Sequence, residues 1–111
     1  MSTPETPASL SGVELIAAER ARQTSQEGWT PEHDDEHAKS ELVDAAGCYA
    51  EAAIVLQNGM SIDVVLETPE LWPWAFEWWK PSADPVRNLV KAGALIAAEI
   101  DRIQRAKGAN E

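Results

Sequence analysis

Apolar residues recur at helical spacing in three long stretches of the chain. In the first stretch, Val13 and Ile16 begin a repeat that continues to about Gln26. Ser11 stands three residues before Glu14, which is the spacing of a capping box, where two residues satisfy each other's free backbone N–H groups. The pattern predicts a helix that begins after Ser11 and ends near Gln26.

The second repeat begins after Ser40, a residue type favoured at a helix N-cap, and stops at Asn58 and Gly59. Its apolar stripe consists of Leu42, Ala45, Ala46, Tyr49, Ala53 and Leu56. Alanine or glycine occupies positions 45, 46, 47, 50, 52 and 53, and so little side-chain bulk lets a neighbouring helix approach closely. We therefore expect tight packing or an oligomer contact on this helix.

The third repeat has the clearest start, because Asp84 suits the N-cap and Pro85 suits the first helical position. Its apolar positions are spaced by 4, 3, 4 and 3 residues, at Leu89, Gly93, Ile96, Ile100 and Ile103. The helix is predicted to end near Lys107. The cations near that end, where the helix dipole favours positive charge, are Arg102, Arg105 and Lys107.

The connecting segments are short. Residues 28–39 combine glycine and proline with two His, two Glu and two Asp, which predicts a polar loop or a single turn. Residues 60–66 are apolar but too few for periodicity to separate a strand from a helix, so both interpretations stay open. Residues 71–80 hold four of the five tryptophans and, with prolines at 73 and 81, predict a compact aromatic loop with room for one turn.

Together these elements predict an all-α fold, a small three-to-four-helix bundle with a Trp-rich loop before the last helix. Residues 1–10 are expected to form a flexible lead-in, residues 11–107 a single helical domain and residues 108–111 a tail. Because three helices of this length bury a modest core, we expect oligomerisation with copies of the same chain to complete the bundle.

Composition narrows the functional classes. The 111 residues include 9 Lys and Arg against 19 Asp and Glu, and the net charge of −10 opposes non-specific binding to nucleic acid or an anionic membrane. No stretch approaches 18 consecutive apolar residues, and the single cysteine, Cys48, cannot form an internal disulfide. We therefore expect a cytoplasmic protein with no direct DNA binding and no membrane partner.

The first candidate site is a row of side chains on the second predicted helix. Glu41, Asp44, Cys48 and Glu51 are spaced by 3, 4 and 3 residues and share one helix face. Carboxylates one turn apart supply the oxygen ligands that Mg²⁺ prefers. The alternative interpretation is the solvated face of an ordinary amphipathic helix.

The second candidate site is the polar run His33, Asp34, Asp35, Glu36 and His37. The two histidines share a face if this turn is helical. No glutamate directly follows His33, so the HExxH motif of zinc peptidases is absent. The alternative is a solvated acidic loop placed favourably before a helix start.

The third candidate site combines aromatic rings with cations in an otherwise acidic chain. Its members are Trp72, Trp74, Phe76, Trp78, Trp79, Lys80, Arg87 and Lys91. Tryptophan stacks on nucleobases, and cations near a helix N-terminus hold phosphate, so the segment predicts a nucleotide site. The alternative is that the tryptophans plug the open end of the bundle, with Lys80 over a ring as a cation–π partner.

The segments EGWTPEHDDEH, WWKP and NLVKAGALIAAEIDR, in this order, resemble a family of small uncharacterised proteins encoded by tailed bacteriophages and prophages. The resemblance covers about Gly12 to Arg105. It implies a viral origin and expression in the cytoplasm of a bacterial host.

A weaker resemblance is to MazG-type all-α nucleoside triphosphate pyrophosphohydrolases. In that family one helix carries an ExxE pattern and a later helix an ExxD pattern, which hold Mg²⁺ together. Glu41 and Asp44 fit the first pattern in a loosened form. Asn88 and Lys91 stand where the second pattern needs two acids, which argues against catalysis.

The leading hypothesis is a phage-encoded protein that binds a nucleotide or a cyclic-nucleotide-type signal and sequesters it from a bacterial antiphage defence. In this hypothesis Trp72, Trp78 and Trp79 stack on the base, and Lys80, Arg87 and Lys91 bind the phosphate. His33 and His37 cover the site. It requires no catalytic residue and no cofactor.

Two alternatives belong to other functional classes. One is a Mg²⁺-dependent nucleotide pyrophosphohydrolase with Glu41, Asp44 and Glu51 as metal ligands. The other is an acidic inhibitor that binds a host defence protein such as a CRISPR complex, in place of nucleic acid.

Overall fold

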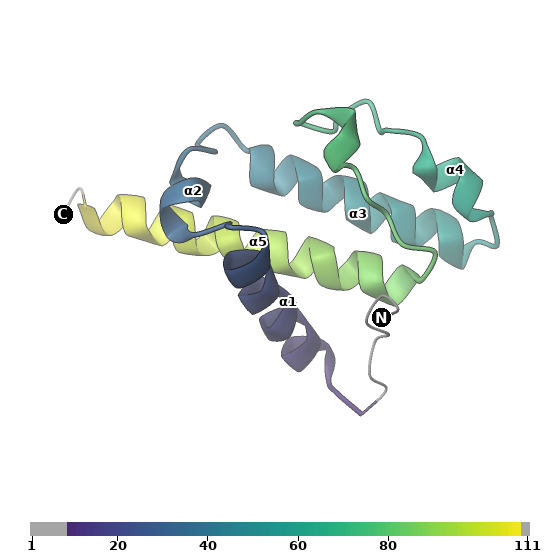
Figure 1. The fold of residues 1–111 in the computed structure, drawn as a ribbon, viewed down its shortest axis with the longest axis horizontal. Coiled ribbons are helices and arrows are strands. Elements are labelled where there is room, and N and C mark those ends of the chain that lie inside the picture. The colour runs from purple at the N-terminus through teal and green to yellow at the C-terminus, as the bar shows by residue number, and fades with distance from the viewer. Residues whose placement is uncertain (1–8, 110–111) are drawn as a thin grey trace.

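The computed structural model describes residues 9–109, and every regular element within them is helical (Figure 1). The elements are α1 (Gly12–Gln26), α2 (Pro31–Asp35), α3 (Glu41–Gln57), α4 (Ile62–Leu66), a 3₁₀ turn (Phe76–Trp78) and α5 (Pro85–Ala109). The all-α prediction is therefore confirmed. Residues 1–8 of the predicted lead-in and residues 110–111 of the predicted tail lie outside the described residues.

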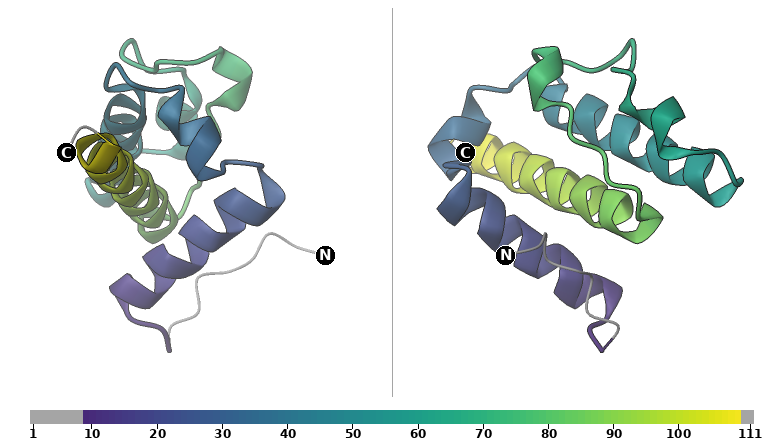
Figure 2. Two further views of the ribbon diagram at one scale, coloured as in Figure 1. Left: turned by 90° about the vertical axis from the view of Figure 1, so that its left-hand side faces the viewer. Right: turned by 45° about the vertical axis from the view of Figure 1, so that its right-hand side comes forward.

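The long helix α5 lies between α3 on one side and α1 on the other, as both Figure 1 and the right-hand view of Figure 2 show. α3 and α5 share the most extensive contact, whereas α1 and α2 pack against α5. α4 and the Trp-rich segment run over the opposite side of α3. None of the helices in residues 9–109 combines the length and the hydrophobicity that a membrane span requires.

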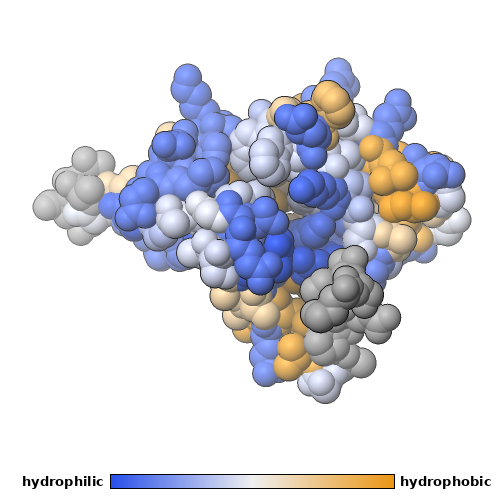
Figure 3. All heavy atoms as spheres, viewed as in Figure 1, coloured by the Kyte–Doolittle hydropathy of each residue, from blue (hydrophilic) through white to orange (hydrophobic). Residues whose placement is uncertain are grey.

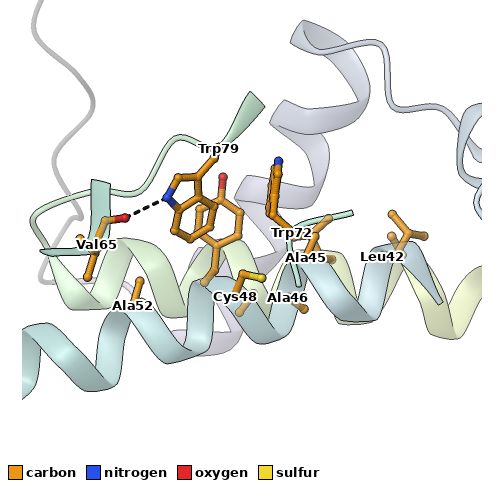
Figure 4. Close-up of a cluster of buried hydrophobic side chains, with 12 residues drawn as sticks. Leu42, Ala45, Ala46, Cys48, Ala52, Val65, Trp72 and Trp79 are labelled. Carbon is orange, nitrogen blue, oxygen red and sulfur yellow. Dashed lines mark hydrogen bonds between the residues drawn. The ribbon is translucent and has the colours of Figure 1, made fainter. Parts of the chain in front are cut away.

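The core is built on small residues of α3, as the run of alanines predicts. The buried side chains of α3 are Leu42, Ala45, Ala46, Cys48, Tyr49, Ala52 and Ala53. Small side chains let α5 approach closely, and Leu95 of α5 is only 1% exposed. Trp72 and Trp79 cover the other side of this cluster (Figure 4).

Tyr49 connects the two buried tryptophans. Its ring centroid lies 5.7 Å from that of Trp72 and 4.7 Å from that of Trp79. The indole N–H of Trp79 donates a hydrogen bond of 2.8 Å to the backbone carbonyl of Val65 in α4 (Figure 4). This bond satisfies the one polar group that the indole brings into the core and attaches α4 to it.

All three predicted helix starts are confirmed, and two of them have the side-chain caps that the sequence indicates. The Ser11 hydroxyl accepts from the Glu14 N–H at 3.2 Å, and the Glu14 carboxylate accepts from the Ser11 N–H at 3.0 Å. At α5, Asp84 Oδ1 accepts from the Val86 N–H at 2.9 Å. Both caps depend on residues within one turn of each other, so the local sequence suffices to specify them.

At the third start, Ser40 occupies the predicted N-cap position but does not cap the helix through its side chain. Ser40 stands at the N-cap of α3, but its φ of 70° is left-handed instead of extended, and its side chain makes no capping bond. The Ser40 hydroxyl lies 3.1 Å from the Asp44 carboxylate, to which it donates. The chain enters α3 through a tight turn from α2, and this turn sets the backbone at Ser40.

The apolar repeat of α5 predicts the helix correctly but does not mark its buried side. Leu89, Ile96, Ile100 and Ile103 are all 45–51% exposed. The side of α5 that faces the core carries Ala92, Leu95 and Ala98, with Asn88 and Glu99 also buried.

The connecting segments follow or refine the predictions. Residues 31–35 form one helical turn, and the Trp-rich segment contains a single 3₁₀ turn, so both loops are confirmed. The undecided stretch 60–66 contains the helix α4.

Candidate functional site

A cavity of about 430 Å³ opens where the Trp-rich segment meets α2 and the start of α3. We call it the aromatic cavity. It is lined by Glu27, Trp29, His33, His37, Leu42, Trp72, Trp74, Ala75 and Trp78. Six of these nine residues carry an aromatic or imidazole ring, so the walls present flat, polarisable surfaces.

The rings of the aromatic cavity pack against one another in sequence. Trp29 stacks on His33 with an angle of 4° between planes, and His33 meets His37 edge-on at 4.9 Å. His37 lies 5.2 Å from Trp74, which in turn meets Trp72 at 5.3 Å. The histidines therefore form part of the wall, and the helical turn of α2 brings them together as the sequence predicts.

Salt bridges and caps fix α2 in place. Thr30 Oγ1 accepts from the His33 N–H at 3.3 Å, which caps α2. Asp34 is fully buried and accepts from Arg20 of α1 at 2.7 Å. Trp29 is held by its own N–H, which donates to the Gln23 carbonyl at 3.0 Å. The histidine wall is thus positioned by contacts with α1.

Two polar atoms of the cavity wall are buried and have no hydrogen-bond partner within residues 9–109. They are Trp74 Nε1 and His33 Nδ1, and the nearest acid to the latter is Asp34 at 3.7 Å, beyond hydrogen-bond range. A buried polar group without a partner is costly, so each of these two atoms calls for a physical explanation.

A second, smaller cavity of about 60 Å³ adjoins the first, and we call it the lysine cavity. It shares Glu27, Trp29 and Trp78 with the aromatic cavity. Its other lining residues are Glu19, Arg22, Gln23, Tyr49, Lys80, Lys91 and Leu95. One end of the combined site is therefore aromatic, and the other end carries cations.

Lys80 and Lys91 are the cations without an acidic partner here. Lys80 Nζ lies 5.4 Å above the Trp78 ring, and Lys91 Nζ lies 5.3 Å above the Tyr49 ring. Lys91 also donates to the backbone carbonyl of Lys80 at 2.7 Å. Neither lysine forms an ion pair with a carboxylate in the part of the chain that the structure describes.

Burial weakens the charge on Lys91. Loss of solvation, followed by the nearby positive charge of Arg87, lowers the pKa of Lys91 to about 8. Burial likewise raises the pKa of Tyr49 to about 12. Lys91 is thus a cation near neutrality that an approaching anion would stabilise.

The arginines beside this cavity are already paired. Glu19 is 3% exposed and accepts two bonds of 2.8 Å from Arg22 and one of 2.6 Å from Arg87. Gln23 Nε2 donates to the same carboxylate at 3.0 Å, whereas the buried Gln23 Oε1 has no partner among the described residues. Arg22 also pairs with Glu27 at 2.8 Å.

The structure brings together six of the eight predicted ligand residues. Those that line the two cavities are Trp72, Trp78, His33, His37, Lys80 and Lys91. The other two lie elsewhere, because Trp79 is buried with its N–H on Val65 and Arg87 is paired with Glu19. Two features of the packing alternative are present, since Trp79 packs in the core and Lys80 lies over the Trp78 ring.

Trp29 is the main residue of the site that the sequence does not assign to it. Trp74 belongs to the third candidate site predicted from the sequence, although the leading hypothesis gives it no role. Trp29 lies 43 positions before Trp72, and only its place beside the polar run links it to the histidines.

The acidic row of α3 is spread over separate contacts. Glu41 accepts a hydrogen bond of 2.6 Å from the Lys39 N–H and lies 3.5 Å from His37. Asp44 accepts a hydrogen bond from the Ser40 hydroxyl. Glu51 lines a different cavity beside Cys48. Within residues 9–109 no group of three or more His, Cys, Asp or Glu side chains is arranged to hold a metal ion. Cys48 is buried, and burial raises the pKa of its thiol, as expected for an unreactive cysteine.

Comparison with known proteins adds no further assignment. Neither a protein-family model nor a curated protein nor a solved structure matches this chain. The functional argument therefore depends on the two adjoining cavities.

Proposed function

We propose that this protein binds a nucleotide-type small molecule, with the base in the aromatic cavity and a phosphate in the lysine cavity. The observation that carries the proposal is that the two cavities share Trp29 and Trp78. A ligand with an aromatic ring at one end and an anion at the other would fit both.

The size and chemistry of the aromatic cavity support a base. Small-molecule sites occupy roughly 300–1,000 Å³, and about 430 Å³ is available here. Stacking a base on an aromatic side chain contributes about 1–3 kcal/mol. Trp74 Nε1 supplies an unused hydrogen-bond donor for a ring nitrogen or carbonyl of the base.

The charge distribution supports a phosphate at the other end. Lys80 and Lys91 line the lysine cavity and form no ion pair among the described residues, whereas the guanidinium groups of Arg22 and Arg87 beside it are paired with Glu19. Two ammonium groups beside a small cavity favour a phosphate electrostatically. Gln23 Oε1, a buried acceptor, suits a sugar hydroxyl beside that phosphate.

The resemblance to phage and prophage proteins extends this proposal to a biological role. A phage-encoded binder that holds a nucleotide signal without cleaving it would remove that signal from a bacterial defence system. This role needs neither a catalytic residue nor a metal.

The test incubates the purified protein and Mg²⁺ with a panel of nucleotides that includes cyclic dinucleotides and cyclic ADP-ribose forms. Mass spectrometry then measures each nucleotide in solution before and after heat denaturation. Depletion followed by intact release on heating is the expected result. Conversion to products would favour the pyrophosphohydrolase alternative, and an unchanged panel would overturn the proposal and favour a host-protein partner.

Variants locate the site. Replacing Lys80 or Lys91 with alanine should weaken retention about 10- to 100-fold, because each removes a charge-assisted hydrogen bond worth about 1.5–3 kcal/mol. Lys107→Ala, an exposed lysine in the last turn of α5, is the matched control. Trp78→Ala should also weaken retention, whereas Phe76→Ala, which is 74% exposed and lines neither cavity, should not.

A further inference from the structure

Glu27 lies where the two cavities of the site meet. The residues that line both cavities are Glu27, Trp29 and Trp78, and of these three only Glu27 is charged. Its backbone is fixed as the C-cap of α1, where its N–H donates to the Gln23 carbonyl at 3.2 Å. The Glu27 side chain is 31% exposed, and Figure 3 shows that hydrophilic residues cover this end of α1. A polar part of a ligand can therefore reach it.

One oxygen of the Glu27 carboxylate is used and the other is free. Oε1 accepts a hydrogen bond of 2.8 Å from Arg22, whereas Oε2 has no donor within residues 9–109. The Arg22 guanidinium balances the negative charge of Glu27, so the carboxylate repels a neighbouring phosphate only weakly. A carboxylate oxygen only accepts hydrogen bonds. The free oxygen thus suits a ligand group that donates.

Gln23 supplies a second acceptor, one helical turn before Glu27. The Gln23 side chain lines the lysine cavity and is 2% exposed. Its Nε2 donates to the Glu19 carboxylate, and because a carboxylate cannot donate in return, this bond determines which end of the amide is nitrogen. Gln23 Oε1 is then a buried acceptor without a partner among the described residues. Two acceptors therefore lie on the α1 side of the site.

We propose that Glu27 accepts a hydrogen bond from the 2′-hydroxyl of a ribose, so that the site selects ribonucleotides over deoxyribonucleotides. This inference rests on the proposed function, which places the base on one side of Glu27 and the phosphate on the other. The part of a nucleotide that joins base and phosphate is the sugar, and its hydroxyls are the donors that suit Glu27 and Gln23. The 2′-hydroxyl is free even where the 3′-oxygen is esterified, as in 3′,5′-linked cyclic dinucleotides.

The expected selectivity follows from the loss of one hydrogen bond to a charged acceptor. Such a bond changes affinity by about 10- to 100-fold. A site that binds a hydroxyl rejects the analogue without it, because the acceptor then loses water without gaining a partner. We therefore expect a 2′-deoxynucleotide to bind about 10- to 100-fold more weakly than its ribonucleotide.

Equilibrium dialysis of the purified full chain measures this ratio. The probes are the 5′-monophosphates of adenosine, guanosine, cytidine and uridine, each paired with its 2′-deoxy counterpart. These are the smallest ligands in which a base and a phosphate are joined by ribose, and the members of a pair share both groups. Equal dissociation constants within every pair that binds, or tighter binding of the deoxy member, would overturn this inference and leave the proposed function standing. Binding of none of these nucleotides would overturn both.

Glu27→Ala separates recognition of the hydroxyl from support of Arg22. The variant should bind the ribonucleotide as weakly as the wild type binds the deoxynucleotide, and its affinity for the deoxynucleotide should stay close to that of the wild type. Glu32→Ala is the matched control, since Glu32 is an exposed acid of α2 that lines neither cavity, and it should keep the wild-type ratio. Circular dichroism establishes that both variants are folded. If Glu27→Ala weakens both members of a pair and keeps their ratio, Glu27 only positions Arg22 and the inference is wrong.

Discussion

The half-buried Lys91 makes the stability of this protein depend on pH in an unusual direction. Its pKa is about 8 in the fold, against an ordinary value of 10.5. Between these values the unfolded chain binds a proton at this lysine that the folded chain has released, so the free energy of unfolding rises with pH. At about 1.4 kcal/mol per pKa unit, the rise between pH 7 and pH 10 is about 2.5 kcal/mol.

Two other groups oppose this effect at higher pH. Burial raises the pKa of the Cys48 thiol above its ordinary 9.0 and that of Tyr49 to about 12. Both hold their protons longer in the folded chain, so they lower stability as the pH rises through the unfolded values. Lys91→Met keeps these two contributions, and the difference between wild type and variant therefore isolates the lysine.

Urea unfolding followed by circular dichroism at pH 7, 8, 9 and 10 measures this difference. Relative to Lys91→Met, the wild type should gain about 2.5 kcal/mol between pH 7 and pH 10, mostly above pH 8. Lys107→Met, at an exposed position of the same helix, is the matched control for the loss of a lysine. A constant difference for Lys91→Met would refute the reasoning, since Lys91 would then keep its ordinary pKa in the fold.

Three further predictions concern the site and the packing. Retention of a phosphate-bearing ligand should weaken by up to about tenfold per pH unit above pH 8, because Lys91 loses its charge there. Retention that does not change with pH would show that Lys91 does not bind the phosphate. Gly93→Ala should destabilise the wild type by about 1–3 kcal/mol, because the added methyl group clashes with Ile16. In an Ile16→Ala background the same substitution should stabilise the protein by up to about 1 kcal/mol. The urea midpoints of the wild type, the two single variants and the double variant test both expectations. Trp79→Phe should lower the free energy of unfolding by about 2 kcal/mol by leaving the Val65 carbonyl without its donor, and an unchanged midpoint would contradict that role.

The three long helices could be predicted because their signals are local. A capping box and an aspartate before a proline act within one turn, and the structure places both caps where the sequence does. Ser40 is the N-cap of α3 as predicted, but its left-handed backbone could not be predicted from the local pattern, because it belongs to the turn that leaves α2. Periodicity also indicates that α5 has an apolar side, but it does not indicate what covers that side.

The site was only partly predictable. Contacts between residues close in the sequence could be predicted, whereas contacts between distant residues could not. Residues that are close together in the chain, such as the two histidines or Trp78 and Lys80, remain neighbours in the fold. The assignment of Arg87 is different, because its partner Glu19 is 68 positions away and nothing local indicates the pair. A cation in a segment that the sequence predicts as a binding site can thus already form an ion pair with a buried acid from another helix.

That buried acid explains how α1 stays on the fold. Of the 15 residues of α1, only Glu19 and Gln23 are buried, so the helix is anchored more by polar contacts than by an apolar core. Burial raises the pKa of Glu19, but hydrogen bonds and charge from Arg22 and Arg87 outweigh that effect and hold the pKa below its ordinary 4.5. The stability contributed by this carboxylate is present above pH 4.5 and is lost as the pH falls through the folded pKa.

Glu19→Ala tests whether this network anchors α1. Breaking a buried pair by removing one partner costs about 3–5 kcal/mol, and here two arginines lose the acid. Because α1 contacts mainly α5, we expect hydrogen exchange to increase in α1 while α3 and α5 stay protected. Nucleotide retention should fall as well, since Glu19 and its neighbours form a wall of the lysine cavity. Glu14→Ala, at an exposed position of the same helix, removes only the capping contact with Ser11 and should leave α1 packed on α5. Equal protection of α1 in both variants would show that apolar contacts such as Ile16 on Gly93 suffice to hold the helix.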